Sequence, residues 1–243
     1  STQGYSSAAS DVYKRQILRS MPQSSLSIGK NYATWALLLA QARDKVYGKR
    51  LPDSLNIPSS DKLVQDAMDY FEKEGDLKRM AQTYYYKGQL LKDQKKITEA
   101  MPFFLKSKEM MTKLDEPLFT YLICQSLGNM YRYQDLYEES LVQLKDAYQY
   151  ALRSGNGERI SYALSELGRT YVHKNEMDSA LFYFGKSLDN AQRLGNIELE
   201  AMAMGELGVV YNKLSQGEKA LHYTRKELDL CLQISSLHKL PQV

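Results

Sequence analysis

Apolar residues recur every three to four positions along most of the chain, which is the spacing of one face of an α-helix. In the segment "ALFYFGKSLDNAQRL" five residues fall on one such stripe, at Ala180, Phe184, Leu188, Ala191 and Leu194. A stripe of this kind is buried when the helix packs against a neighbour. The pattern therefore predicts an all-α protein built from packed amphipathic helices.

The helical pattern repeats every 40 residues. Four glycines mark the repeat, at Gly88, Gly128, Gly168 and Gly208. Three residues after each glycine stand Leu91, Tyr131, Tyr171 and Tyr211. Twelve residues after each glycine comes a small side chain, at Ala100, Ser140, Ala180 and Ala220. Four residues further on come Phe104, Leu144, Phe184 and Thr224. A spacing held over four units indicates a repeat architecture.

The glycines need a physical reason, because glycine inside a helix costs about 1 kcal/mol relative to alanine. Close approach of two helices is the natural reason. We expect the glycine of a first helix to face the small residue of a second helix, where a larger side chain would push the two apart.

The ends of the helices carry local signals. Three pairs resemble capping boxes at the start of second helices, the third more loosely: Asp135 with Glu138, Ser215 with Glu218, and Asn175 with Asp178. Two pairs, Gly155-Asn156 and Gly195-Asn196, are placed to end second helices, where a left-handed residue is favoured.

The sequence Leu-Gly-x-x-Tyr, followed by a small residue and then an aromatic residue, resembles the fingerprint of the tetratricopeptide repeat (TPR) family. "LGNMY", "LGRTY" and "LGVVY" carry it, whereas the first unit lacks the Leu and the Tyr. The period of 40 residues exceeds the usual period of about 34, so the units resemble a long-helix variety. The resemblance implies a right-handed α-solenoid of antiparallel helix hairpins, with TPR units at 77–116, 117–156, 157–196 and 197–236.

The flanking segments are less regular. Residues 31–76 are interpreted as a degenerate helical hairpin, and residues 237–243 as the start of a truncated further unit. Near the N-terminus, "SSAASDVYKRQ" resembles, when back-translated, a transposase adapter used in preparing DNA sequencing libraries, although its composition also suits a disordered tail. We expect residues 1–16 to be an artefactual or disordered tail and residues 17–30 to be the remnant of a truncated helix and loop. The localisation, cytoplasmic or envelope-attached, therefore stays open.

Composition argues against several classes of function. Without the tail the chain has 30 basic and 28 acidic residues, which is not the clustered basic surface that nucleic-acid binding needs. The longest run that is apolar apart from one Thr, "ATWALLLA", is far shorter than the roughly 18 residues of a membrane span. Cys124 and Cys231 lie far apart in helical segments, so they suggest neither a disulfide framework nor a metal site. We interpret Cys124 as a small core residue.

The sequence also lacks the motifs that are typical of enzymes. The three histidines, His173, His222 and His238, have no partners at the spacing of a metal-binding helix motif. The repeat glycines lie inside helices, where their N–H groups are already bonded and cannot bind phosphate. We therefore expect no catalytic residue, no cofactor and no metal site.

In TPR arrays the first helices line a concave groove, and the resemblance implies which positions face it here. These positions are Tyr85, Gln89, Lys92, Gln125, Asn129, Arg132, Tyr133, Ser165, Arg169, His173, Gly205, Val209, Asn212 and Lys213. Asn and Gln can bond an extended peptide, and the basic residues could attract carboxylates. Of the 19 tyrosines most are expected to pack between helices, while Tyr85 and Tyr133 are better placed for contact. A solvated wall without a ligand is the alternative.

Two hypotheses of function follow from these observations. The first is a non-catalytic scaffold that binds a protein or peptide, with acidic segments as candidates, in its groove. The Lys/Asn clamp of co-chaperone TPR proteins is not matched, which argues against a chaperone-tail adaptor. The second is the sensory or oligomerising region of a larger bacterial regulator, whose output domain lies elsewhere; a homo-oligomer through the repeat ends is open. An enzyme fused to the array ranks third.

Overall fold

A computed structural model describes residues 33–34, 36–38 and 60–237. Within these ranges nearly every residue is helical and no strand occurs, in agreement with the all-α expectation. The chain divides into two compact units, Ser1–Asp115 and Glu116–Val243, which are described separately below as unit 1 and unit 2. The tail expected at 1–16 and the remnant expected at 17–30 lie outside the described residues, as does the C-terminal end after residue 237.

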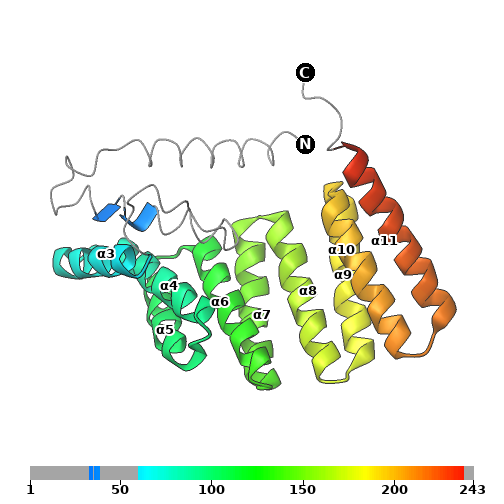
Figure 1. The fold of residues 1–243 in the computed structure, drawn as a ribbon, viewed down its shortest axis with the longest axis horizontal. Coiled ribbons are helices and arrows are strands. Elements are labelled where there is room, and N and C mark those ends of the chain that lie inside the picture. The colour runs from blue at the N-terminus through cyan, green and yellow to red at the C-terminus, as the bar shows by residue number, and fades with distance from the viewer. Residues whose placement is uncertain (1–32, 35, 39–59, 238–243) are drawn as a thin grey trace. The chain divides into compact units, whose positions relative to one another are not determined.

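Unit 1 contains, in its described part, the helices α3 (Ser60–Glu74), α4 (Leu77–Asp93) and α5 (Ile97–Lys113). The middle helix α4 packs against both α3 and α5 (Figure 1). Phe71 of α3 and Phe104 of α5 are fully buried between them. Residues 33–34 and 36–38 are helical as well, while the other residues before 60 in the hairpin expected at 31–76 lie outside the described ranges.

Unit 2 contains six described helices, which run from α6 to α11. Their bounds are Pro117–Tyr133 (α6), Tyr137–Ser154 (α7), Gly157–His173 (α8), Met177–Leu194 (α9), Ile197–Lys213 (α10) and Gly217–Leu237 (α11). Each helix contacts the next one along the chain, and α8 also contacts both α6 and α10 (Figure 1). The helices α6, α8 and α10 therefore form one row, which packs against a second row of α7, α9 and α11.

The repeat glycines are buried inside α4, α6, α8 and α10, but their closest neighbours differ from the expected ones. A Cβ atom on Gly128 would lie 2.5 Å from Cγ of Leu144 and 3.3 Å from the carbonyl oxygen of Ser140. A Cβ atom on Gly168 would lie 2.5 Å from the ring of Phe184. The small residue of the second helix is thus a secondary contact. Each glycine mainly makes room for the larger side chain sixteen positions later.

The capping-box prediction is wrong. Asp135, Asn175 and Ser215 have positive φ angles of 58°, 63° and 58°, so they are left-handed turn residues after the first helices rather than N-caps. The residues that follow them, such as Leu136 and Glu176, occupy the N-cap positions and make no side-chain capping bond. The Asp/Asn/Ser residues were mistaken for N-caps because the same residue types also tolerate the left-handed conformation.

The expected Gly-Asn ends are confirmed, and the asparagines have a second role. Gly155 and Gly195 end α7 and α9 with φ angles of 66° and 62°. The next residues, Asn156 and Asn196, cap the following helices, because their Oδ1 atoms accept hydrogen bonds from backbone N–H groups at 3.0 Å. One dipeptide therefore ends one helix and starts the next.

Tyrosines and Cys124 occupy the packing positions that the sequence suggested. Tyr171 stacks on Tyr183 with ring centroids 5.3 Å apart, and Tyr211 stacks on Tyr223 at 5.4 Å in the next repeat. Cys124 is fully buried in a cluster with Tyr121. These contacts join first and second helices, which explains part of the large tyrosine content.

Candidate functional site

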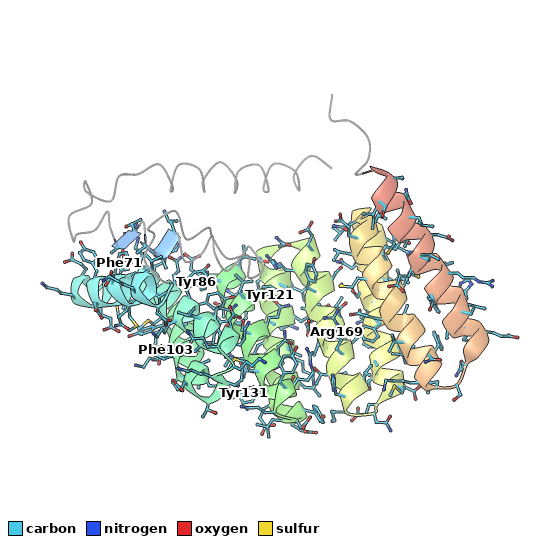
Figure 2. The ribbon with its side chains drawn as sticks, viewed as in Figure 1. Phe71, Tyr86, Phe103, Tyr121, Tyr131 and Arg169 are labelled. Atoms are coloured by element: carbon cyan, nitrogen blue, oxygen red, sulfur yellow. The ribbon has the colours of Figure 1, made fainter. Side chains whose placement is uncertain are left out.

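Unit 2 contains a cavity of about 490 Å³ on the row formed by α6, α8 and α10. All three helices of this row supply its wall, together with α9 and α11 of the second row. Its lining residues are Arg132, Tyr133, Arg169, Val172, His173, Phe184, Met202, Gly205, Glu206, Val209 and Glu227. Arg169 projects from α8 toward α10 (Figure 2), where it binds Glu206. We call this the unit 2 cavity.

A chain of ion pairs links three lining residues of the unit 2 cavity, Arg132, Arg169 and Glu206, through Glu166. Nη1 of Arg132 lies 2.7 Å from Oε2 of Glu166, and the other oxygen of Glu166 lies 2.7 Å from Nη1 of Arg169. Arg169 in turn binds Oε1 of Glu206 through Nη2 at 2.6 Å and Nε at 2.7 Å. The four side chains thus tie α6 to α8 and α8 to α10.

Arg132 is the most enclosed of the cations among the described residues, with 7% of its surface exposed. Its Nη1 also donates to the carbonyl oxygen of Glu166 at 3.3 Å and contacts Oγ1 of Thr170 at 3.5 Å. A buried charge is tolerated when it is paired and hydrogen-bonded in this way. Arg132 therefore has a structural role in joining the helices, in addition to its place in the cavity wall.

Glu206 carries a charge that the protein compensates only in part. Burial raises the pKa of its carboxyl group, while the charge of Arg169 acts in the opposite direction. Oε1 is bound by Arg169, but Oε2 is buried without a hydrogen-bond partner among the described residues. A buried carboxylate oxygen in this state is costly unless a further positive group approaches it.

Gly205 brings a second carboxylate to the same place. A Cβ atom at Gly205 would lie 2.5 Å from Oε1 of Glu227 and 2.7 Å from its Cδ. The carboxylate of α11 therefore lies directly against the backbone of α10, next to Glu206. Glycine permits this close approach because it has no side chain.

The rest of the wall is apolar or aromatic. Tyr133 is 78% exposed and Val209 is 56% exposed, although both are large apolar or aromatic residues. Phe184, which is buried, forms part of the floor, and Val172 and Met202 complete the apolar portion. A ligand in the cavity would therefore meet both apolar surface and paired charges, as is typical of binding pockets.

The cavity unites some of the residues that the sequence assigned to the groove. Arg132, Tyr133, Arg169 and His173 line it, together with Gly205 and Val209. The other assigned residues of unit 2 do not line it; these are Gln125, Asn129, Ser165, Asn212 and Lys213. Ser165 is 1% exposed, and its Oγ lies 3.1 Å from Oγ of Ser187, so it packs between α8 and α9.

The residues that were assigned in unit 1 are placed differently from the expectation. Tyr85 is 4% exposed and packs edge-on against Phe104, so it is a core residue and not a contact residue. Gln89 is also buried and donates to the hydroxyl of Tyr85 at 2.6 Å. Lys92 is half-buried near the end of α4. None of the three lines either of the cavities described for the two units.

Arg132 and Arg169 also differ from their expected state. The sequence suggested that they could attract the carboxylates of a partner, but Glu166 and Glu206 of the chain itself already hold them. The acidic lining residues Glu206 and Glu227 were missed. A signal for Glu206 exists in the sequence, because opposite charges stand 34 and 37 residues apart on successive first helices, at Arg132 and Glu166 and at Arg169 and Glu206.

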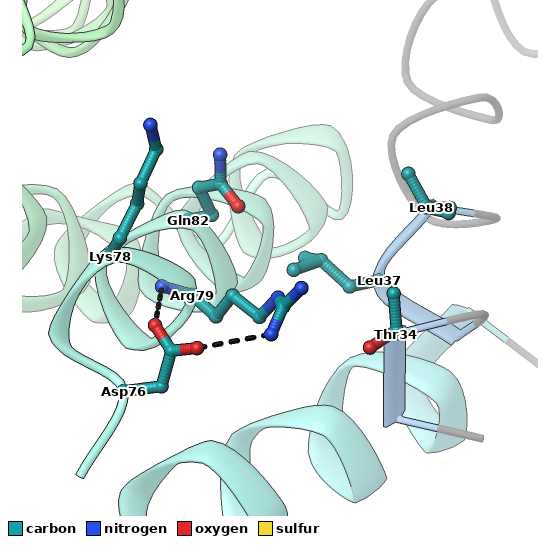
Figure 3. A pocket seen from close by; sticks show the side chains of 7 residues that line it. All are labelled: Thr34, Leu37, Leu38, Asp76, Lys78, Arg79 and Gln82. Carbon is teal, nitrogen blue, oxygen red and sulfur yellow. Dashed lines mark hydrogen bonds and ion pairs between the residues drawn. The ribbon is translucent and has the colours of Figure 1, made fainter. Parts of the chain in front are cut away.

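A second cavity of about 470 Å³ lies in unit 1 and is shown in Figure 3. Asp76 and Arg79 account for most of its charge, but they serve the local helix. Oδ1 of Asp76 accepts the backbone N–H of Arg79 at 3.1 Å, and Oδ2 binds the guanidinium of Arg79 at 3.1 Å. Because this pair caps α4, the unit 2 cavity is the better candidate for a binding site.

The described residues contain no group of three or more His, Cys, Asp or Glu residues that could hold a metal ion. Of the helices in that part of the chain, none is both long and apolar enough to cross a bilayer.

Comparison with known proteins gives matches in structure only. No protein-family model and no curated protein sequence matches the chain. The apo form of RapI has a TM-score of 0.73 and 15% identity, with 96% of this chain and 65% of that chain covered. A Rap conjugation gene regulator of a plasmid, in complex with the Phr* peptide, has a TM-score of 0.56 and 18% identity, with 92% and 58% covered.

A third similar structure is a signal transduction ATPase (STAND) with a tetratricopeptide repeat sensor from Pyrococcus horikoshii. It has a TM-score of 0.63 and 20% identity, and 77% of this chain and 28% of that chain are covered. The fold is that of a TPR-type helical repeat. The chain spans less than two thirds of the length of each of these three proteins, and identities this low bear on the fold alone.

Proposed function

We propose that this TPR-type repeat is a non-catalytic scaffold that binds a peptide, or an extended segment of a protein, in the unit 2 cavity. The observation that carries the proposal is the cavity itself, where side chains from α6, α8, α10 and α11 converge on one hollow. Its position on the row of first helices is the position that the TPR resemblance assigns to the binding groove.

The exposure of apolar residues in the cavity supports this function. Tyr133 and Val209 leave more than half of their surface uncovered at the rim of a hollow, where a partner could bury it. Exposed aromatic and aliphatic residues around a concave site are typical of peptide-binding surfaces. The likeness to a Rap regulator whose structure contains a Phr* peptide is consistent with a peptide ligand.

A matched pair of variants tests the site. Val209→Trp fills the cavity with a larger side chain, whereas Val142→Trp places the same side chain on α7, outside the cavity. The two valines are equally exposed, at 56% and 58%, so the fold should tolerate both changes. Peptides are first selected on the wild-type protein from a random display library, and their affinity for each variant is then measured.

We expect the selected peptides to bind Val142→Trp as tightly as the wild type and Val209→Trp at least tenfold more weakly. Equal binding to both variants would show that the peptides bind elsewhere. A selection that enriches no peptide would contradict the binding function itself. Circular dichroism of both variants controls for the fold.

A second function is kept because one of the similar structures, the STAND protein, is described as having a tetratricopeptide repeat sensor. In this case the repeat would be the sensory or oligomerising region of a larger regulator. The complete open reading frame decides the matter: a DNA-binding, kinase or ATPase domain on the same chain supports it. A reading frame that consists of repeats and a capping helix alone contradicts it.

A further inference from the structure

The charged groups of the unit 2 cavity are not balanced. Arg132 and Arg169 are its two cations of fixed charge, and both are bound to glutamates of the chain. The charge of Glu166 is already engaged by the chain itself, because each of its oxygens lies 2.7 Å from one of the two arginines. Against the two arginines stand Glu166, Glu206 and Glu227, so one negative charge is left over.

The uncompensated charge is located at Glu206 and Glu227. Oε2 of Glu206 is buried without a hydrogen-bond partner among the described residues. Ser165 lies near this carboxyl group and helps to lower its pKa, but its hydroxyl is also 3.1 Å from Oγ of Ser187 and brings no positive charge.

Glu227 is half-buried, as is Glu206. It forms no salt bridge within the described residues, and it lies against Gly205, one position from Glu206. Two carboxylates from α10 and α11 thus share one wall of the cavity, while the apolar residues Val172, Met202 and Val209 form other parts of it.

We propose that the unit 2 cavity receives a Lys or Arg side chain of the bound peptide, whose charged end binds Glu227 beside Glu206 and whose aliphatic stem lies on the apolar wall. This assignment rests on the proposed function and specifies its ligand. Lys and Arg fit because they combine a cation with a long apolar stem. A metal ion is disfavoured as the occupant, because the described residues contain no group of three suitable ligands.

The ligand preference is tested with four libraries of N-acetylated, C-amidated hexapeptides. Each library has one fixed residue, which is Lys, Arg, norleucine or Glu, and uncharged random residues elsewhere. Retention on the immobilised protein is compared at low salt and at 0.5 M NaCl. Norleucine matches the stem of Lys without its charge, so the difference between these two libraries isolates the charge.

Two variants remove the carboxylates from the cavity in different ways. Glu227→Gln removes the charge and keeps the size of the side chain. Gly205→Ala leaves the charge on the chain but displaces it, because the added Cβ would lie 2.5 Å from Oε1 of Glu227. Glu218→Gln, at an exposed position of α11, and Gly185→Ala, where a Cβ meets nothing within 4 Å, are the matched controls.

We expect the wild type and both controls to retain the Lys and Arg libraries about tenfold better than the norleucine library, with the preference reduced in salt. Glu227→Gln and Gly205→Ala should lose that preference. Best retention of the Glu library, or an unchanged Lys and Arg preference in both variants, would overturn the cation site while leaving peptide binding intact. Failure of all four libraries to bind would contradict the proposed function as well.

Discussion

At the scale of single residues, the repeat glycines illustrate what can and cannot be inferred from a sequence. Their spacing predicted close helix packing, and all four are buried in first helices. The sequence did not reveal which side chain fills the space, because a residue sixteen positions away can only be placed once the crossing of the two helices is known. Leu144 and Phe184, rather than the small residues, turned out to be the direct neighbours.

The glycines should therefore differ in their tolerance of alanine. Gly128→Ala is expected to destabilise the protein by about 2 kcal/mol, because the new Cβ would overlap Leu144 and approach a backbone carbonyl. At Gly208 the nearest atom is the hydroxyl of Thr224 at 3.0 Å, so Gly208→Ala should be nearly neutral. Urea unfolding measures both. Equal losses of stability in the two variants would mean that the side chain sixteen positions after each glycine does not determine whether alanine is tolerated there.

The buried end of the ion-pair chain gives a second prediction. Arg132→Met is expected to lower the free energy of unfolding by about 3 kcal/mol, because it leaves the buried Glu166 carboxylate with one cation and removes the hydrogen bonds that Arg132 donates to Thr170 and to the Glu166 carbonyl. Lys174→Met removes a cation from an ion pair with the exposed Glu138 and should cost far less. Similar losses for both variants in urea unfolding would contradict a buried structural role for Arg132.

The pH dependence of stability reports on Glu206. Its pKa is raised in the folded state, mainly by burial, with the charges of Arg169 and Glu166 acting in opposite directions and the Glu227 carboxylate nearby. A carboxyl group with a raised folded pKa stabilises the protein below its unfolded pKa, and this contribution is lost as the pH rises through the folded value. Relative to Glu206→Gln, the wild type should therefore lose stability as the pH rises from about 4, the ordinary range of a glutamate, through the raised folded pKa. Denaturation at several pH values measures the difference, and the opposite trend would contradict it.

At the scale of helices, the repeat pattern fixed the positions of the elements better than their ends. First helices begin at Leu77, Pro117, Gly157 and Ile197, spaced by 40 residues as the glycines are. The capping boxes failed because Asp, Asn and Ser suit both an N-cap and a left-handed turn, and only the backbone conformation decides between them. The Gly-Asn pairs were less ambiguous, since glycine strongly favours a left-handed helix end.

The two kinds of helix end respond differently to alanine. Asn196→Ala removes the acceptor for the N–H of Leu199 and is expected to cost about 1 kcal/mol. Ser215→Ala should change stability little, because Ser215 is a left-handed turn residue and not an N-cap. Thermal unfolding of the two variants provides the measurement. A clear loss in Ser215→Ala alone would restore the capping-box interpretation.

At the scale of the whole molecule, the sequence was sufficient for the class of fold and for part of the candidate site. Helical periodicity and a fixed repeat depend on local residues, so they can be recognised without coordinates. The ion pairing of Arg132 and Arg169 could not be recognised in this way, because their partners come from neighbouring repeats 34 and 37 residues away. The acidic character of the unit 2 cavity likewise depends on α10 and α11 meeting at Gly205.

The most direct test of the account is a titration of uniformly ¹⁵N-labelled protein with a peptide selected on the wild type, followed by amide chemical shifts. Binding in the unit 2 cavity predicts the largest shifts at Tyr133, His173, Gly205 and Val209, which line it. Shifts centred instead on the exposed side of α7 and α9, around Val142 and Phe182, would contradict the assignment of the binding site.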